Sequence, residues 1–246
     1  MEKVNSIANN LFSITERIAR AAERSNRTPD SIELVAVTKG RSVPEIHAAL
    51  AAGATNIGEN RVQEARQKYA AVTSVVDAVR VIPAAKTCRW HLIGHLQRNK
   101  VKVALDMFSL IHSVDSLRLL AEIARRAEEQ ALQIEVLIQV NTTRETSKYG
   151  LDAEELLPFM ADAQAYPTAN IVGLMTMGQF SPSPDANRPA FALLRSLAEK
   201  AEAEQFPGVT MQYLSMGMTN DFEVAIEEGA NLVRIGRAIF EPSMSV

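Results

Sequence analysis

Short apolar runs alternate with amphipathic stretches along almost the whole chain. Residues 32–38, IELVAVT, are nearly all apolar or β-branched, which is typical of a buried strand. Similar runs predict seven further strands, at residues 54–58, 90–94, 107–114, 134–141, 170–177, 210–216 and 230–236. Between the strands, helical spacing of apolar residues predicts helices over residues 43–53, 60–72, 96–105, 116–130, 152–166, 190–204 and 220–229. One more helix is expected over residues 4–25, with Pro29 after its end.

This alternation of strands and helices indicates a parallel sheet. Several of the strands are apolar almost throughout, as strands buried on both faces are. Eight such strands in 246 residues predict a (β/α)8 TIM barrel. Too few residues follow the eighth strand for a full helix, so we expect the extra N-terminal helix to cover that gap in the outer ring. A doubly wound open sheet is the alternative. No linker interrupts the pattern, which favours a single domain over residues 1–246.

Composition and charge exclude several classes of function. The formal net charge of −3 gives no electrostatic signal for nucleic acid or an anionic membrane. No run approaches the ~20 apolar residues of a membrane span, and the amino terminus does not resemble a signal peptide. Cys88 is the only cysteine, so no internal disulfide can form and a cytoplasmic location is expected. Lys86 and Arg89 can lower its thiol pKa, but no motif surrounds it and we regard it as incidental.

The strand ends collect the polar residues and glycines of the chain. In a TIM barrel the carboxyl ends of all strands meet at one rim, where active sites lie. The strands end in Thr38-Lys39-Gly40, Glu59-Asn60, His91 to His95, His112 to Asp115, Asn141, Met175 to Gly178, Ser215 to Asn220, and Arg234 to Arg237. We therefore expect the function of the protein at this rim.

The last two strand ends favour a phosphate site. Barrels frequently bind phosphate with the loops after strands seven and eight. Residues 215–221, SMGMTND, supply a hydroxyl, a glycine and a helix start whose N–H groups attract anions. Residues 234–240, RIGRAIF, add Gly236 and the amides that follow it. Either stretch alone is an ordinary turn, but together they predict phosphate binding.

Lys39 is expected to lie beside this phosphate site, because closing the barrel brings the first strand next to the eighth. A lysine at a strand end is usually solvated. Among the apolar walls of a barrel mouth, however, its amine can attack an aldehyde. A reactive lysine next to a phosphate anchor leaves two ligand classes open: a sugar phosphate, as in a Schiff-base aldolase, or pyridoxal 5'-phosphate.

Arg234 is predicted to point into the barrel on the same face as Gly236. An arginine stays protonated, so three roles remain open. It can pair with a rim acid such as Glu59, bind the phosphate, or donate to a pyridine nitrogen. The last role would leave that nitrogen unprotonated and weaken the ring as an electron sink.

The other candidates carry weaker signals. His91 and His95 flank a strand end and no carboxylate cluster accompanies them, so we expect no metal site. Met175 and Met177 fit core packing, although one of them can line the face of a ring. Asn60 either contacts a ligand or caps the helix that follows. Ser215 has no histidine or acid near it in sequence to make it a nucleophile. The Rossmann and P-loop glycine patterns are absent.

Seven segments of the chain resemble the pyridoxal phosphate homeostasis protein family, the YggS/PROSC group. They run in the family order from Leu34 to Phe240: LVAVTKGRSVPEI, GENRVQEA, WHLIGHLQRNK, IHSVDS, VLIQVNTTRETSKYG, GLMTM and LSMGMTNDFEVAIEEGANLVRIGRAIF. The resemblance implies a fold type III barrel, related to the barrel of alanine racemase, with pyridoxal phosphate as its cofactor.

The same resemblance implies roles for individual residues. Lys39 would form the Schiff base, Arg234 would face the pyridine nitrogen, and Asn60 would lie near the ring. The residues that would hold the phosphate are Ser215, Gly217 and Gly236.

Two positions depart from the family pattern. Arg237 stands where many relatives have threonine, so one hydroxyl contact to the phosphate is missing. Its backbone amide remains, and its cation can compensate. Glu241 replaces a glycine, with no consequence that the sequence alone reveals.

The function implied by the resemblance is binding of pyridoxal phosphate for intracellular homeostasis, without established catalytic turnover. Apo-enzymes that need the cofactor would be transient partners. The chain lacks the extra β-domain with which racemases complete their site, and no long exposed apolar stripe suggests an oligomer, so we expect a monomeric carrier rather than an enzyme. The alternatives are a racemase-like enzyme and a Schiff-base aldolase.

Overall fold

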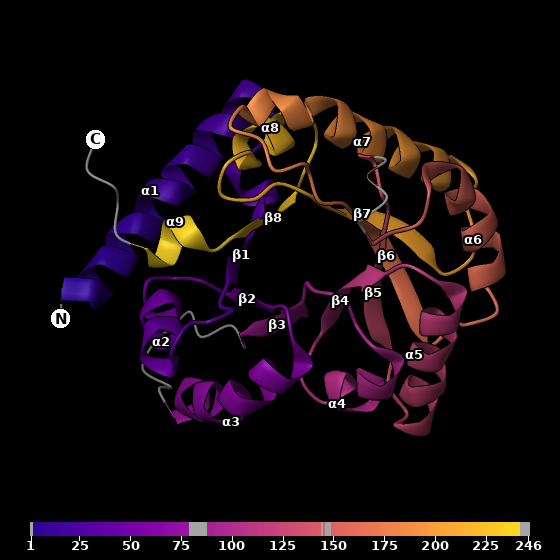
Figure 1. Cartoon of the computed structure of the whole chain (residues 1–246), viewed down its shortest axis with the longest axis horizontal. Coiled ribbons are helices and arrows are strands. Elements are labelled where there is room, and N and C mark those ends of the chain that lie inside the picture. The colour runs from indigo at the N-terminus through magenta and orange to yellow at the C-terminus, as the bar shows by residue number, and fades with distance from the viewer. Residues whose placement is uncertain (1, 79–87, 144, 146–148, 242–246) are drawn as a thin grey trace.

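Eight parallel strands close into a barrel in chain order, with β8 hydrogen-bonded to β1 (Figure 1). The computed structural model describes residues 2–78, 88–143, 145 and 149–241. The strands are β1 Glu33–Val37, β2 Asn56–Glu59, β3 Arg89–Leu92, β4 Leu110–Val114, β5 Ile134–Gln139, β6 Ala169–Met175, β7 Val209–Ser215 and β8 Leu232–Ile235. The predicted (β/α)8 TIM barrel is confirmed, and the alternative of an open sheet is wrong.

Helices form the outer ring of the barrel. They are α1 Glu2–Arg24, α2 Val43–Ala51, α3 Val62–Ala78, α4 Val101–Leu105, α5 Leu117–Glu129, α6 Leu156–Ala163, α7 Arg188–Ala203, α8 Phe222–Glu227 and α9 Arg237–Phe240. The predicted helices before β4 and β6 are shorter than expected, because 3-10 turns at Arg98–Lys100 and Ala153–Glu155 replace their first residues. Ser116 caps α5 as a residue of its type should, accepting from Leu119 N over 3.4 Å.

The extra N-terminal helix covers the gap that follows β8. Figure 1 shows α1 running along the outside of the barrel beside α8 and α9, and it also contacts α2. Its apolar stripe of Ile7, Leu11, Ile14 and Ile18 is buried. A single-turn helix, α9, follows β8 and packs under α1. The predicted position of α1 is therefore confirmed.

The barrel interior changes character from its middle to its mouth. A small apolar cluster fills the middle and consists of Val35, Leu110, Leu137, Val172, Met175, Tyr213 and Leu232. Buried polar side chains lie at and below the carboxyl ends of the strands: Thr38, Glu59, His91, His112, Ser215 and Arg234. Burying polar groups is costly unless each is hydrogen-bonded, so the hydrogen-bond partners of these side chains need to be identified.

No helix in the part of the chain that the structure describes has the length and apolar character needed to span a bilayer.

Candidate functional site

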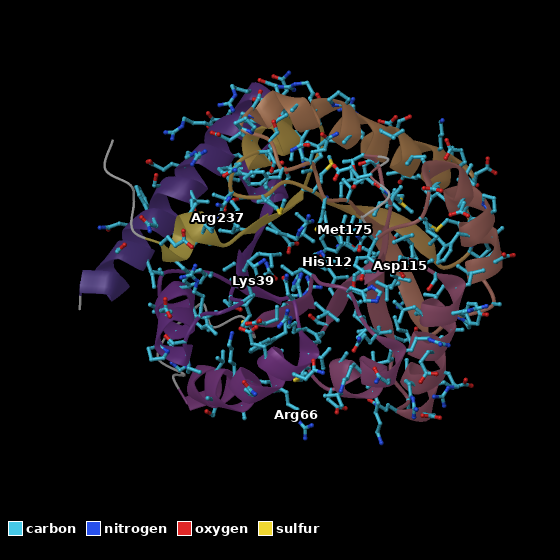
Figure 2. All side chains as sticks on the ribbon, viewed as in Figure 1. Lys39, Arg66, His112, Asp115, Met175 and Arg237 are labelled. Atoms are coloured by element: carbon cyan, nitrogen blue, oxygen red, sulfur yellow. The ribbon has the colours of Figure 1, made fainter. Side chains whose placement is uncertain are left out.

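A cavity of about 440 Å³ opens at the carboxyl ends of the strands. Its volume lies within the range of small-molecule sites, roughly 300–1,000 Å³. Five of the predicted site residues line it: Lys39, Asn60, Arg234, Gly236 and Arg237. Figure 2 shows His112 near the middle of the barrel, Lys39 on the side of β1 and β2, and Arg237 nearer to α9. Strand pairing of β1 with β8 brings Lys39 and Arg234 to the same cavity, as the sequence predicted.

A larger groove, of about 620 Å³, lies at the opposite end of the barrel. It runs between α1 and the amino-terminal ends of β1, β2 and β3, where Glu33, Asn56 and Arg89 begin the strands. The guanidinium of Arg89 is already paired there, with 2.8 Å between its Nη2 and Oε2 of Glu135. Because the chemistry of TIM barrels lies at the other rim, we assign function to the smaller cavity.

Arg234 enters the cavity from its floor. The side chain is buried, and its Nη1 donates to Oγ of Ser215 over 2.5 Å while its Nη2 donates to the carbonyl oxygen of Thr176 over 2.8 Å. Burial lowers the pKa of Arg234 to about 10, so the guanidinium stays charged at neutral pH. Two fixed hydrogen bonds orient the planar group and leave other N–H donors for a ligand.

An ion pair between Arg234 and Glu59, one of the roles left open by the sequence, is wrong. The buried Glu59 carboxylate accepts from Oγ1 of Thr38 over 2.7 Å and from Nζ of Lys68 over 2.9 Å. Burial raises the pKa of Glu59, and these two donors act against that rise. Arg234 therefore remains available to the cavity.

Ser215 lies below the cavity rather than in its wall. Its Oγ is 2.9 Å from Nδ1 of His112, and Nε2 of His112 is 3.0 Å from Nδ1 of His91. The result is a buried polar chain that runs from Arg234 through Ser215 and His112 to His91. His112 comes from β4, far from Ser215 in sequence, so this partner escaped the sequence analysis.

The two histidines of this hydrogen-bonded series, His91 and His112, are neutral at pH 7. Burial lowers the pKa of His91 to about 3 and that of His112 well below its ordinary value. Arg234 can only donate, so Oγ of Ser215 accepts from it, and the serine proton is best placed on the bond to Nδ1 of His112. His112 then carries its proton on Nε2 and donates to His91. The hydroxyl hydrogen of Ser215 therefore points to His112, and its oxygen accepts the hydrogen bond from Arg234.

Ser215 and His112 do not form a nucleophilic pair. Both side chains are fully buried, and the second ring nitrogen of His112 meets another histidine instead of a carboxylate. A Ser–His nucleophile needs access to substrate and a group that stabilises the protonated imidazole. The hydrogen bonds of Ser215 and His112 therefore orient Arg234, and the pair does not provide a nucleophile for acyl transfer.

The loop after β7 forms the side of the cavity where the sequence predicts a phosphate site. Thr219 and Asn220 line the cavity, whereas Gly217 does not. Gly217 has a φ of +90°, and a Cβ there would lie 2.5 Å from Cβ of Ala225, so packing against α8 requires the glycine. The loop is closed by Asp221, whose Oδ1 accepts from N of Met218 over 2.7 Å. Of the two hydroxyl residues at this strand end, Ser215 and Thr219, only Thr219 lines the cavity, and the sequence analysis did not single it out.

Arg237 and Glu241, the two departures from the family pattern, take part in polar contacts at the rim. Nη2 of Arg237 is 3.5 Å from Oδ1 of Asn220, and both residues line the cavity. Oε1 of Glu241 is 3.0 Å from Nη2 of Arg41, which follows the Lys39 turn. Glu241 therefore ties the end of α9 to the loop after β1.

Asn60 and Met177 line the cavity walls. Helix α3 begins at Val62, and its first main-chain bond runs from Ala65 N to Arg61 O over 3.0 Å. Arg61 thus occupies the cap position, and the interpretation of Asn60 as the cap is wrong. Met177 faces the cavity, whereas Met175 is buried in the apolar cluster of the barrel.

Cys88 and the histidines give no second reactive site. Burial raises the pKa of Cys88 to about 12, which is consistent with the interpretation of this cysteine as incidental, and Lys86 lies outside the described residues. His95 stacks on Tyr149 at the surface, with 4.3 Å between ring centroids. Among the described residues, no group of three or more histidine, cysteine or acidic side chains is arranged to hold a metal ion.

The chain is similar to known proteins over nearly its full length. Residues 10–243 match the model of the alanine racemase N-terminal domain. The pyridoxal phosphate homeostasis protein of Aquifex aeolicus is 37% identical over 230 residues, which cover 94% of this chain and 95% of that relative. The protein of the same name from Escherichia coli K12 is 34% identical over 245 residues, covering 96% and 97%.

A solved structure of PipY from Synechococcus elongatus, with PLP bound, shares the architecture of the chain. It superposes with a TM-score of 0.77 at 32% identity, covering 95% of this chain and 99% of PipY. These relatives confirm the resemblance found in the sequence motifs. The chain therefore belongs to the pyridoxal phosphate homeostasis protein family.

Proposed function

We propose that this protein binds pyridoxal 5'-phosphate at the barrel mouth and holds it for intracellular homeostasis of the cofactor. One observation carries the proposal: Lys39 and the guanidinium of Arg234 approach one cavity from neighbouring strands. The amine can react with an aldehyde, and the fixed guanidinium can donate to a pyridine nitrogen. Pyridoxal phosphate carries both groups on one small ring. The relatives named for homeostasis of this cofactor support the same ligand.

The residues present fit the cofactor group by group. The cavity of about 440 Å³ suits a small phosphorylated ring, and Asn60 and Met177 provide a polar and an apolar wall. On the phosphate side we assign the hydroxyl of Thr219, the backbone at Gly236 and the cation of Arg237. The sequence predicted that Ser215 and Gly217 hold the phosphate. In this proposal Ser215 instead orients Arg234, and Gly217 allows the loop after β7 to pack against α8.

Covalent attachment through Lys39 is a condensation. The neutral amine of Lys39 would form a C=N bond with the aldehyde carbon, and the aldehyde oxygen would leave as water with the two amine protons. No oxidant or further reactant is needed. Lys39 suits this role because it is exposed at the end of β1 and lines the cavity, whereas the amine of Lys68 is held by three acceptors.

Arg234 supports the proposal that the protein holds the cofactor rather than turning over a substrate. When bound, the cofactor supplies an aldehyde for amines and a ring that can accept electrons. A guanidinium donor leaves the ring nitrogen unprotonated, which weakens that electron sink. The protein then retains the aldehyde in a form that an amine or an apo-enzyme can take up.

We extend the proposal to the setting of the protein. Residues 1–246 act as a single domain and as a monomer in the cytoplasm, and apo-enzymes that require the cofactor are transient recipients. Transfer is tested by mixing loaded protein with an apo-enzyme and following the activity that appears. Turnover is tested by incubating loaded protein with a panel of amino acids and measuring their chirality and keto-acid products, for which we expect no change.

The experiment that tests cofactor binding is an absorption spectrum of the purified protein with added pyridoxal phosphate, before and after borohydride. We expect an imine band that borohydride removes in the wild type and that is absent in Lys39→Ala. Lys102→Ala, at an exposed lysine on α4, is the matched control and should behave as the wild type. A protein that stays colourless after incubation contradicts the proposal.

A further inference from the structure

Lys68 of α3 reaches back to the main chain next to Lys39. Its Nζ donates to the carbonyl oxygen of Thr38 over 2.9 Å, to Oε1 of Glu59 over 2.9 Å and to Oε1 of Glu64 over 2.6 Å. An ammonium group has three donors, so this set of acceptors saturates it. The side chain of Lys68 is only 12% exposed.

Glu64 of the same helix holds the other side of Lys39. Its Oε1 accepts from the main-chain N–H of Gly40 over 2.5 Å. Gly40 has a φ of +69°, a left-handed conformation that glycine adopts without strain. The two peptide groups that flank Lys39 are therefore both fixed, one through its carbonyl and one through its N–H.

Polar contacts, rather than apolar packing, hold this turn. Lys39 and Gly40 are exposed, so no core residue encloses them. Glu59, in contrast, is fully buried beneath the turn, where it accepts from Thr38 Oγ1 over 2.7 Å. A buried carboxylate is costly unless its partners compensate, so Glu59 depends on the donors Thr38 and Lys68 beneath the turn.

We propose that Lys68, Glu64 and Glu59 form a clamp that positions Lys39 for attack on the aldehyde of the cofactor. We use the word clamp for these three side chains. The inference rests on the proposed function. They are positioning residues: Lys68 and Glu64 hold the main chain on the two sides of Lys39, and Glu59 accepts from Lys68 and from the Thr38 hydroxyl. None of the three lines the cavity. Lys68 makes three hydrogen bonds within the protein and leaves the condensation to Lys39.

The physical reason is orientation. Lys39 has a long flexible side chain, so the direction of its Cα–Cβ bond decides where the amine meets the aldehyde carbon. A misplacement of about 1 Å can cost a reacting group roughly 100-fold in rate. Releasing the N–H of Gly40, or leaving the Thr38 carbonyl with only its bond from Arg41 N, lets the exposed turn relax and spreads the amine over many positions.

The test separates covalent attachment from simple binding. Stopped-flow absorbance gives the rate constant of imine formation with pyridoxal phosphate. The affinity for pyridoxine 5'-phosphate, which carries an alcohol in place of the aldehyde, reports binding without attachment. We expect Glu64→Ala and Lys68→Met to form the imine about 10- to 100-fold more slowly, with unchanged affinity for the alcohol analogue.

Matched variants define the effect. Glu64→Gln keeps an oxygen acceptor for Gly40 N–H and should retain most of the wild-type rate. Arg66→Ala, at a side chain that points outward from α3 in Figure 2, should leave the rate unchanged. Lys68→Met leaves buried Glu59 without its cation, so if that variant does not fold, Glu64→Ala alone decides the question.

Two results overturn the clamp: wild-type rates in Glu64→Ala and in any folded Lys68→Met, or a slower rate with an equal loss of affinity for the alcohol analogue. The second pattern reports a collapsed cavity. Lys39→Ala, measured in parallel, separates this failure from that of the proposed function. If Lys39→Ala still forms the imine, the lysine assignment itself is wrong.

Discussion

The guanidinium of Arg234 donates to the hydroxyl of Ser215, with 2.5 Å between Nη1 and Oγ. This contact joins β8 to β7 below the cavity and continues through His112 to His91. The serine is thereby turned into an acceptor for the arginine. The polar floor of the barrel is thus built to orient one cation toward the cofactor site.

Arg234→Lys tests the importance of that orientation. Lysine keeps a positive charge but lacks the planar fork, so it cannot serve Ser215, Thr176 and a ligand together. A hydrogen bond from a charged donor is worth about 1.5–3 kcal/mol, which predicts a loss of roughly 10- to 100-fold in affinity for pyridoxal phosphate. Calorimetric titration measures it. Unchanged affinity would mean that Arg234 does not contribute to binding of pyridoxal phosphate.

Thr219→Val tests the assignment of the phosphate hydroxyl. The substitution preserves shape and removes the hydroxyl that lines the cavity. We expect affinity for pyridoxal phosphate to fall about tenfold or more, and affinity for unphosphorylated pyridoxal to stay the same. Ser215→Ala should instead weaken both ligands, because it acts through Arg234. Equal losses for both ligands in Thr219→Val would contradict the assignment.

The stability of the protein should fall as the pH drops below the ordinary histidine pKa of 6.5. Folded His91, with a pKa of about 3, stays neutral there, while the unfolded chain binds the proton. The same direction holds for His112, which is also shifted downward by burial. Each histidine therefore lowers the free energy of unfolding by up to about 1.4 kcal/mol per pH unit between pH 6.5 and its folded pKa.

His91→Gln isolates this contribution in urea unfolding curves. Glutamine offers His112 an acceptor and does not titrate. Because burial raises the pKa of Glu59, this group increases the free energy of unfolding as the pH falls toward 4.5, which is opposite to the effect of the histidines. The difference in pH slope between wild type and variant is therefore the informative quantity. We expect the pH slope to become shallower by up to about 1.4 kcal/mol per unit in the variant. Parallel slopes would mean that His91 is protonated when folded.

Cys88 should resist thiol reagents in the folded protein. Burial raises its pKa to about 12, and the thiolate is the reactive form. Modification by a disulfide reagent at pH 8 should be slow without denaturant and fast in its presence. Rapid modification of the native protein would place the thiol in an electropositive, accessible setting instead.

Much of the fold could be predicted because its signals are local. The eight apolar runs and the helical spacing between them identify the barrel, and closure then places Lys39 beside Arg234. Helix ends were harder to predict: the 3-10 turns before α4 and α6 depend on how the loops pack. The turn before α3 likewise put Arg61, not Asn60, in the cap position.

The site was predicted less completely because its contacts cross the barrel. Ser215 and His112 are 103 residues apart, and no local pattern reveals that β7 and β4 bring them within hydrogen-bond distance. Glu64 and Lys68 read as an ordinary i,i+4 pair on an exposed helix. Only the fold shows that they reach the main chain on either side of Lys39.

The most direct test of the account is to reduce the loaded protein with borohydride, digest it and locate the adduct by mass spectrometry. We predict a single pyridoxyl-phosphate adduct, on the peptide that contains Lys39. An adduct on Lys68 or any other lysine, or no adduct at all, would contradict the claim that Lys39 holds the cofactor at the mouth of the barrel.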